Sequence, residues 1–123
     1  MRLFGVLNAS PDSLNEDSIV RNGDDARRRA DQLLAEGVWG FDLGGQGSTF
    51  AATQSTFDEE WARLAPVLPV LAELGRPISI DTWRPEIARR ALDAGATFTL
   101  DEAAAALRYV ADGRAIGKVV LTI

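Results

Sequence analysis

The chain has 123 residues, of which 46% are hydrophobic, so it is long enough for one domain with a buried core. It lacks cysteine and histidine, which excludes disulfides, thiolate metal sites, histidine-bound zinc and histidine-dependent catalysis. The net charge of −5, with no basic run longer than the arginines at 27–29, argues against nucleic acid as a partner. Because the sequence also lacks a secretory signal pattern and an apolar run of about 18 residues, we expect a cytoplasmic protein with no membrane partner.

Short apolar runs alternate with longer stretches of helical spacing along the chain. The apolar runs predict five strands, at residues 3–8, 38–45, 77–81, 97–100 and 118–123. The helical spacing predicts four helices, at residues 24–37, 56–75, 84–95 and 101–114. Strands that alternate with helices are typical of an α/β protein with a mostly parallel sheet, so we expect a single α/β domain over residues 1–123.

Local signals mark the ends of the first two helices. Asp24 or Asp25 can cap the first helix, and Gly37 can end it. Thr56, followed three residues later by Glu59, is the pattern of a capping box at the start of the second helix.

Prolines and glycines shape the second and third helices. Pro66 and Pro69 should kink the second helix or split it in two, and Gly75 should end it. In the third helix, Pro85 lies in the first turn and Gly95 closes the last one.

Polar side chains follow three predicted strands where each strand ends. They are Asn8 with Asp12 and Ser13, Asp42 with the glycine-rich residues 44–49, and Asp81 with Thr82. Because right-handed crossovers place every strand-to-helix loop at one end of a parallel sheet, we expect these residues to converge there. Carboxylates and an amide at that edge could hold a hydrogen-bonding heterocycle or a hard cation such as Mg²⁺; alternatively, they only end strands and cap helices. The stretch at 44–49 could present N–H groups to a phosphate, but it lacks the ending of a P-loop, so a flexible turn is the default interpretation.

Three stretches resemble, in order and spacing, motifs of dihydropteroate synthase, a folate-pathway enzyme built as a (β/α)₈ barrel. GVLNASPDSL, at 5–14, is similar to that family's Asn-x-Thr-Pro-Asp-Ser-Phe loop. FDLGGQGST, at 41–49, is similar to its Asp-Ile-Gly-Gly-Glu-Ser-Thr-Arg loop. ISIDTWRPEIARRALDAGA, at 78–96, is similar to its Ser-Ile-Asp-Thr segment and the helix that follows. The resemblance covers residues 3–99.

The resemblance implies roles for individual residues. Asn8 would bind the Mg²⁺ or the diphosphate of a pterin diphosphate substrate, Thr49 would contact that diphosphate, and Asp81 would hydrogen-bond the pterin ring. Asp42 completes our set of candidate substrate-binding residues. The family displaces the diphosphate from the methylene carbon of the pterin with p-aminobenzoate, so the enzyme mainly positions reactants and stabilises the leaving charge.

Several positions depart from the family's motifs. Ala9 and Leu14 replace the threonine and phenylalanine of the first motif, and Gly47 is an extra residue in the second. Phe50 replaces the arginine after Ser-Thr, which removes a cationic phosphate contact. Leu100 stands where the family has an asparagine, and the family's later lysine and Arg-x-His motifs do not occur. These departures indicate altered or lost synthase activity.

The last stretch of the chain resembles another family. Residues 100–123 are similar to the C-terminal helix and strand of medium-chain quinone oxidoreductases and enoyl reductases, although no glycine-rich NADPH motif lies upstream. The alternative is a generic helix and strand. Because two resemblances meet near Leu100, we expect a chimera joined there. A complete barrel would need about 250 residues, roughly twice the length of this chain. Its fold would be a half TIM barrel closed by an extra helix and strand, or a flavodoxin-like sheet of five strands.

These observations favour a chimeric or engineered α/β scaffold, derived from a dihydropteroate synthase-like half barrel and without catalytic activity. The alternatives are a dihydropteroate synthase-like transferase and a remnant module that binds pterin or diphosphate beside Asn8 and Asp81. A half barrel leaves strand edges unpaired, so a homodimer formed through these edges is also expected. Mg²⁺ at Asn8 is the one cofactor that the resemblance suggests.

Overall fold

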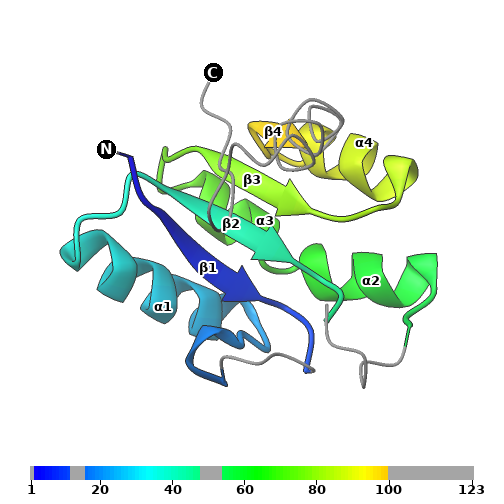
Figure 1. Cartoon of the computed structure of the whole chain (residues 1–123), viewed down its shortest axis with the longest axis horizontal. Helices are drawn as coiled ribbons and strands as arrows, with labels where there is room; N and C mark the ends of the chain where they lie inside the picture. The colour runs from blue at the N-terminus through cyan, green and yellow to red at the C-terminus, as the bar shows by residue number, and fades with distance from the viewer. Residues whose placement is uncertain (1, 12–15, 48–53, 100–123) are drawn as a thin grey trace, which may run out of the picture.

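The computed structural model describes residues 2–11, 16–47 and 54–99. Its strands, β1 (Phe4–Asn8), β2 (Gly40–Gly44), β3 (Ile78–Asp81) and β4 (Phe98–Thr99), form one parallel sheet in that order (Figure 1). Successive strands are neighbours in a β/α barrel, whereas a flavodoxin-like sheet has the order 2-1-3-4-5. The α/β fold with a parallel sheet is therefore confirmed, and the described strands follow the barrel order. The helix predicted at 101–114 and the strand predicted at 118–123 lie outside the described residues.

Helices fill the connections between the strands. The short 3₁₀ helix η1 (Glu16–Ser18) and α1 (Gly23–Ala35) join β1 to β2. Two helices, α2 (Phe57–Leu64) and α3 (Leu68–Ala72), join β2 to β3, and α4 (Pro85–Asp93) joins β3 to β4. Figure 1 shows α1 beside β1 at one side of the sheet and α4 beside β4 at the other. None of the helices that the structure describes has the length and apolar character needed to cross a membrane.

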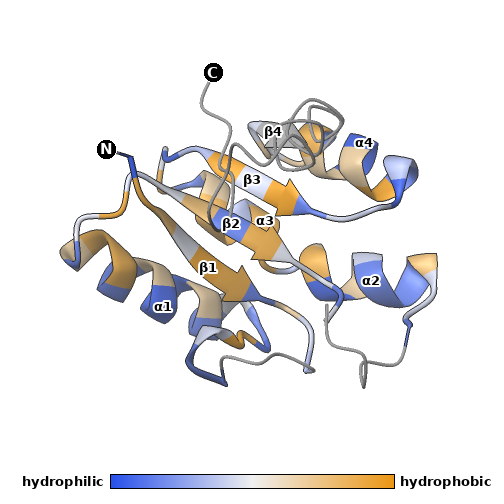
Figure 2. Ribbon diagram, viewed as in Figure 1, coloured by the Kyte–Doolittle hydropathy of each residue, from blue (hydrophilic) through white to orange (hydrophobic). Residues whose placement is uncertain are grey.

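The core lies between the helices and one face of the sheet. Leu7, Leu43 and Ile80 form one row across β1, β2 and β3, and each is at most 1% exposed. They pack with buried residues of every α-helix, namely Ala26, Ala30, Leu33, Leu64, Leu68, Leu71, Ile87 and Ala91. Figure 2 shows the resulting pattern, with hydrophobic segments on the strands and a hydrophilic outer side on α1. Burial of this apolar surface is the main stabilising term for the domain.

The opposite face of the sheet carries the alternate residues of the same strands. Two rows cross it: Val6–Asp42–Ser79, and Asn8–Gly44–Asp81 at the carboxyl ends of the strands. Because successive side chains of a strand point to opposite faces, a polar residue in these rows is directed away from the helix-covered core.

The first helix begins at a different cap from the predicted one. Asn22 has an extended backbone, and its side-chain oxygen accepts a hydrogen bond of 2.8 Å from the N–H of Asp25. Asp24 and Asp25 lie inside the first turn, so the prediction that one of them is the N-cap is wrong. Their carboxylates are close to the positive end of the helix dipole instead. Gly37, with φ of +92°, follows the last turn as predicted.

The second predicted helix is split as its prolines indicate. The helix α2 ends at Leu64 and α3 begins at Leu68, with Pro66 between them and Pro69 in the first turn of α3. Proline lacks the N–H that a continuous helix would need at these positions. Gly75 then adopts φ of +65° after α3, a conformation that favours glycine.

Thr56 and Glu59 form the predicted capping box of α2. The Glu59 N–H donates to Thr56 Oγ1 at 3.2 Å, and the Thr56 N–H donates to Glu59 Oε2 at 2.7 Å. The hydrogen bond from the Thr56 backbone is the largest cause of a lowered pKa for the Glu59 carboxyl. Pro85 and Gly95 likewise bound α4 as predicted, with Gly95 at φ of +110°.

Replacing Thr56 with alanine should lower the free energy of unfolding by about 1 kcal/mol, because the Glu59 N–H loses its acceptor. Urea unfolding followed by circular dichroism measures the change. Thr56→Ser keeps the hydroxyl and is the control, expected to unfold like the parent. Equal stability of the alanine variant and the parent would contradict the capping role.

Candidate functional site

The row Asn8–Gly44–Asp81 forms the candidate site at the carboxyl ends of the strands. Parallel pairing places Asn8 opposite Gly44 and Gly44 opposite Asp81. A Cβ placed on Gly44 would lie 3.6 Å from Asn8 Oδ1 and 3.7 Å from Asp81 Cβ. The side chains of Asn8 and Asp81 therefore flank the space that the missing side chain of Gly44 leaves.

The segment after β1 orients the Asn8 amide. Asn8 Nδ2 donates a hydrogen bond of 2.6 Å to Ser18 Oγ at the end of η1. The backbone carbonyl of Asn8 accepts a hydrogen bond of 2.8 Å from the N–H of Val20. Because its nitrogen faces Ser18, the amide presents its oxygen toward Gly44.

Asp81 ends β3 on the other side of Gly44. Part of its side chain is exposed, yet the surrounding protein partly shields the carboxylate from water. This desolvation raises the pKa of Asp81, and the negative charge of Glu60 raises it further. A carboxylate in such surroundings is a strong acceptor for hydrogen bonds from a bound ligand.

Asp42 lies one row below the candidate site. It is 7% exposed, and its Oδ1 accepts a hydrogen bond of 2.6 Å from Ser79 Oγ on β3. In β2 it precedes Gly44 by two residues, so it shares a face of the sheet with the site without lying at the edge. The structure thus brings Asn8 and Asp81 together at the edge and places Asp42 beneath them.

The remaining predicted site residues are distributed differently. Thr49, Asp12 and Ser13 lie outside the described residues. Thr82 is 9% exposed, and its hydroxyl donates to Glu60 Oε1 at 2.8 Å, so it points away from the row of Asn8 and Asp81.

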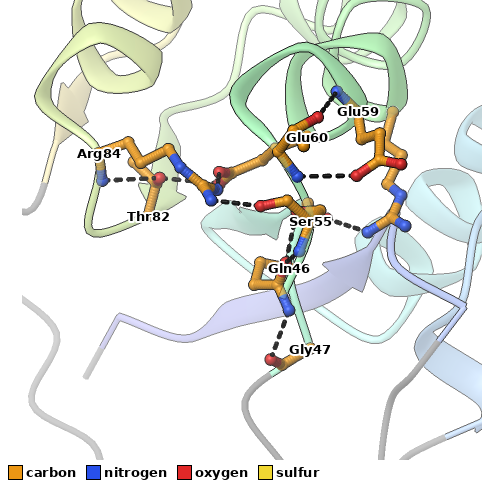
Figure 3. Close-up of polar contacts among 10 residues, drawn as sticks. Gln46, Gly47, Ser55, Glu59, Glu60, Thr82 and Arg84 are labelled. Atoms are coloured by element: carbon orange, nitrogen blue, oxygen red, sulfur yellow. Dashed lines mark hydrogen bonds and ion pairs between the residues drawn. The ribbon is translucent and has the colours of Figure 1, made fainter. Parts of the chain in front are cut away.

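A buried network of polar contacts adjoins the site (Figure 3). Glu60, on α2, is 1% exposed and forms an ion pair with Arg84, whose side chain is 19% exposed. The guanidinium of Arg84 also donates to the backbone carbonyl of Ser55. The backbone N–H of Arg84 donates to Thr82 Oγ1 at 3.2 Å. The carboxylate of Glu60 therefore binds two of the three residues that follow Asp81.

The same network reaches the residues that follow β2. Gln46 Oε1 accepts hydrogen bonds from the backbone N–H of Ser55, at 2.8 Å, and from its hydroxyl. Arg63, on α2, donates to the carbonyl of Gly45 at 3.0 Å. A Cβ on Gly45 would lie 3.1 Å from Glu60 Cγ, so α2 packs directly on the chain after β2.

Glu60 and Arg84 were not among the predicted site residues. Glu60 belongs to an acidic run at 58–60, the pattern of a solvated first turn of a helix. One signal was available: Glu60 precedes the fully buried Leu64 by four residues and so shares its face of the helix. An acid on the buried face of a helix indicates a paired internal charge.

The candidate site has few side chains that could help to hold a magnesium ion. Within the described ranges there is no group of three histidine, cysteine, aspartate or glutamate side chains that could hold a metal ion. Mg²⁺ commonly keeps several waters and takes one or two protein oxygens together with phosphate oxygens. The oxygen of Asn8 fits such a single contribution to an ion that is bound with a diphosphate.

Comparison with known proteins identifies close relatives of this chain. It is 37% identical over 105 residues to the dihydropteroate synthase of Neisseria meningitidis serogroup C, a match that covers 85% of this chain and 37% of the relative. The crystal structure of the Burkholderia cenocepacia dihydropteroate synthase complexed with 7,8-dihydropteroate matches with 39% identity and a TM-score of 0.66, covering 80% of this chain and 31% of the other. The Yersinia pestis dihydropteroate synthase, solved with a sulfonamide drug complex, matches with 29% identity and a TM-score of 0.74, covering 80% and 36%.

The family described as pterin binding enzyme matches residues 4–112 of the chain. The chain spans about a third of the length of the curated relatives it matches, for example 37% of the Neisseria synthase. The family match continues 12 residues past the junction expected near Leu100, since it ends at residue 112. As the matched region includes most of the chain and all the described strands, the chain belongs to the pterin binding enzyme family.

Proposed function

We propose that this chain binds a pterin at the row Asn8–Gly44–Asp81, as the pterin-recognising part of a dihydropteroate synthase-like site. The observation that carries the proposal is the space above Gly44, flanked by an amide oxygen and a partly desolvated carboxylate. Membership of the pterin binding enzyme family supports it, as does the relative that is complexed with 7,8-dihydropteroate.

Asp81 is the proposed anchor for the pterin ring. A pterin presents N–H groups in the plane of its ring, and a carboxylate can accept two of them at once. Such charge-assisted hydrogen bonds gain strength where water is partly excluded, as it is around Asp81. Asp42 forms a polar floor beneath the ring, with its carboxylate held by Ser79.

Asn8 is the proposed contact on the diphosphate side. Its oxygen lies across Gly44 from Asp81, so one ligand can reach both side chains. A magnesium ion bound with the diphosphate would neutralise part of the charge on that leaving group. By resemblance, Thr49 contacts the same diphosphate.

We propose binding without the complete transfer reaction for this chain alone. Transfer would break the bond between the pterin's methylene carbon and a diphosphate oxygen, and form a bond from that carbon to an arylamine nitrogen, which loses a proton. This proposal rests on Phe50, which stands where the family has an arginine and so removes a cationic contact to the diphosphate.

A chimeric origin of the chain is a separate proposal. It rests on the resemblance of residues 100–123 to the end of quinone oxidoreductases and enoyl reductases. The family match overlaps this stretch up to residue 112, so the proposal has its strongest basis beyond that point.

Asp81→Asn should weaken the binding of 6-hydroxymethylpterin at pH 7 by about tenfold or more, the range expected when a charge-assisted hydrogen bond is lost. Titration calorimetry with this pterin and with its diphosphate, each with and without Mg²⁺, measures the affinity. Asp93→Asn, an exposed change at the end of α4, is the matched control and should bind like the parent. Parent-like affinity of the Asp81 variant would refute the proposed pterin contact.

The same variant should be more stable than the parent at pH 7. Because the pKa of Asp81 is raised in the folded chain, its ionised form costs stability above that pKa. This cost disappears below the unfolded pKa of about 3.9, where both states are protonated. The gain in thermal midpoint should therefore shrink as the pH falls toward 4, which calorimetric scans at several pH values would show. A constant or reversed difference would contradict this environment for Asp81.

Homodimer formation through the sheet edge is a further proposal with its own test. Among the described strands, β1 pairs with β2 alone, and Leu3 and Val6 are 51% and 38% exposed. Light scattering after size-exclusion chromatography should show a dimer that Val6→Lys weakens. Leu92→Lys, at a residue 43% exposed on the far helix α4, should leave the dimer intact. A monomer at every concentration would rule the dimer out.

A further inference from the structure

We propose that Glu60 is a positioning residue of the candidate site, which holds Asp81 against Gly44 through Thr82 and Arg84. The inference rests on the proposed function, because it concerns the residue proposed to bind the pterin ring. It assigns a role to a side chain that lies on α2, outside the row of Asn8 and Asp81.

On the β3 side, Glu60 fixes the chain that directly follows Asp81. One carboxylate oxygen accepts a hydrogen bond of 2.8 Å from the Thr82 hydroxyl, and the other forms the ion pair with Arg84. Thr82 also accepts a hydrogen bond from the backbone N–H of Arg84 at 3.2 Å. The turn from Asp81 to Arg84 is thus bound at two positions to one buried carboxylate, as Figure 3 shows.

On the β2 side, Glu60 lies close to Gly45, the residue that follows Gly44. A Cβ on Gly45 would lie 3.1 Å from Glu60 Cγ and 3.2 Å from the Glu60 carbonyl oxygen, so only a glycine allows this approach without a shift. The guanidinium of Arg84 extends the connection to the carbonyl of Ser55. A single side chain therefore binds the turn that follows Asp81 and lies close to Gly45, the residue that follows Gly44.

Stability alone is a weak reason for this arrangement. A buried ion pair loses hydration on folding, and apolar residues of similar volume often replace it at no cost. What apolar residues cannot reproduce is the pair of directional contacts to Thr82 and Arg84. The network therefore contributes a defined geometry at the end of β3, and a ligand that needs Asp81 at a fixed position depends on it.

The test separates positioning from folding with a double replacement, Glu60→Leu with Arg84→Met. This variant should keep a thermal midpoint within about 5 °C of the parent, because a packed apolar pair replaces the ion pair. It should bind 6-hydroxymethylpterin about tenfold more weakly, within the range that loss of an outer positioning contact costs. Glu59→Gln, at the neighbouring exposed residue of α2, is the matched control and should bind like the parent.

A double variant that folds and binds the pterin as tightly as the parent overturns the inference. If the double variant does not fold, the pterin affinity of Glu60→Gln tests the inference instead, because glutamine keeps an acceptor oxygen but loses the charge. Undiminished affinity in this variant also overturns the inference. Failure of the parent to bind the pterin refutes the proposed function instead. In that case the NMR signals of the Gly44 and Asp81 amides, recorded without ligand, still test the role of Glu60. These signals should shift in the double variant and stay unchanged in Glu59→Gln. Unshifted signals in the double variant would overturn the positioning role of Glu60.

Discussion

Parallel pairing of strands in sequential order is the constraint on which the rest of this structure depends. Each strand must be followed by a connection that returns to the starting end of the sheet, and helices provide it. All strands therefore finish at one edge, and the residue that ends each strand meets the residue that ends the next. The register places Asn8, Gly44 and Asp81 in one row for this reason, although more than 30 residues separate each from the next in the sequence. The site is a consequence of topology first and of side-chain chemistry second.

The two faces of the sheet differ in the side chains that they carry. One face is apolar and packs against the helices, and the fully buried leucine and isoleucine side chains lie on this face or on the helices that cover it. The other face holds Asp42 and Ser79 as well as the site, and in a closed barrel it would point to the interior. A change on the helix side should therefore alter mainly stability, whereas a change on the polar side should alter the pterin recognition proposed above.

Sequence patterns predicted most of the fold, because the deciding interactions are local. The capping box of Thr56 and Glu59 lies within four residues, and the break at Pro66 needs only the missing N–H of proline. The N-cap of α1 was predicted wrongly because Asn22, Asp24 and Asp25 can all act as caps. Only the backbone angles of the folded chain select Asn22. Strand order was left open because helices of similar length serve a barrel and a flavodoxin-like sheet equally well.

The candidate site was predicted only in part, because its supporting contacts are not local. Asn8 and Asp81 were recognisable as polar residues that end strands. The partner of Glu60 lies 24 residues further along the chain, and no periodicity in the sequence connects it with Arg84. Asp42 looked equivalent to the other two, but its place two residues before the end of β2 buries it and gives it a hydrogen-bond partner in Ser79.

At Gly44, the requirements of folding and those of the proposed ligand binding differ. Its backbone has an ordinary conformation, and an added methyl group would meet Asn8 and Asp81 at 3.6 and 3.7 Å, which is normal van der Waals contact. Packing would thus accept alanine at this position, and selection for folding does not require glycine there. A methyl group would, however, occupy the space that we propose for the pterin ring. We therefore expect homologues that bind the ligand to keep glycine at this position. Alanine here would be expected in homologues that kept the fold and lost the proposed binding.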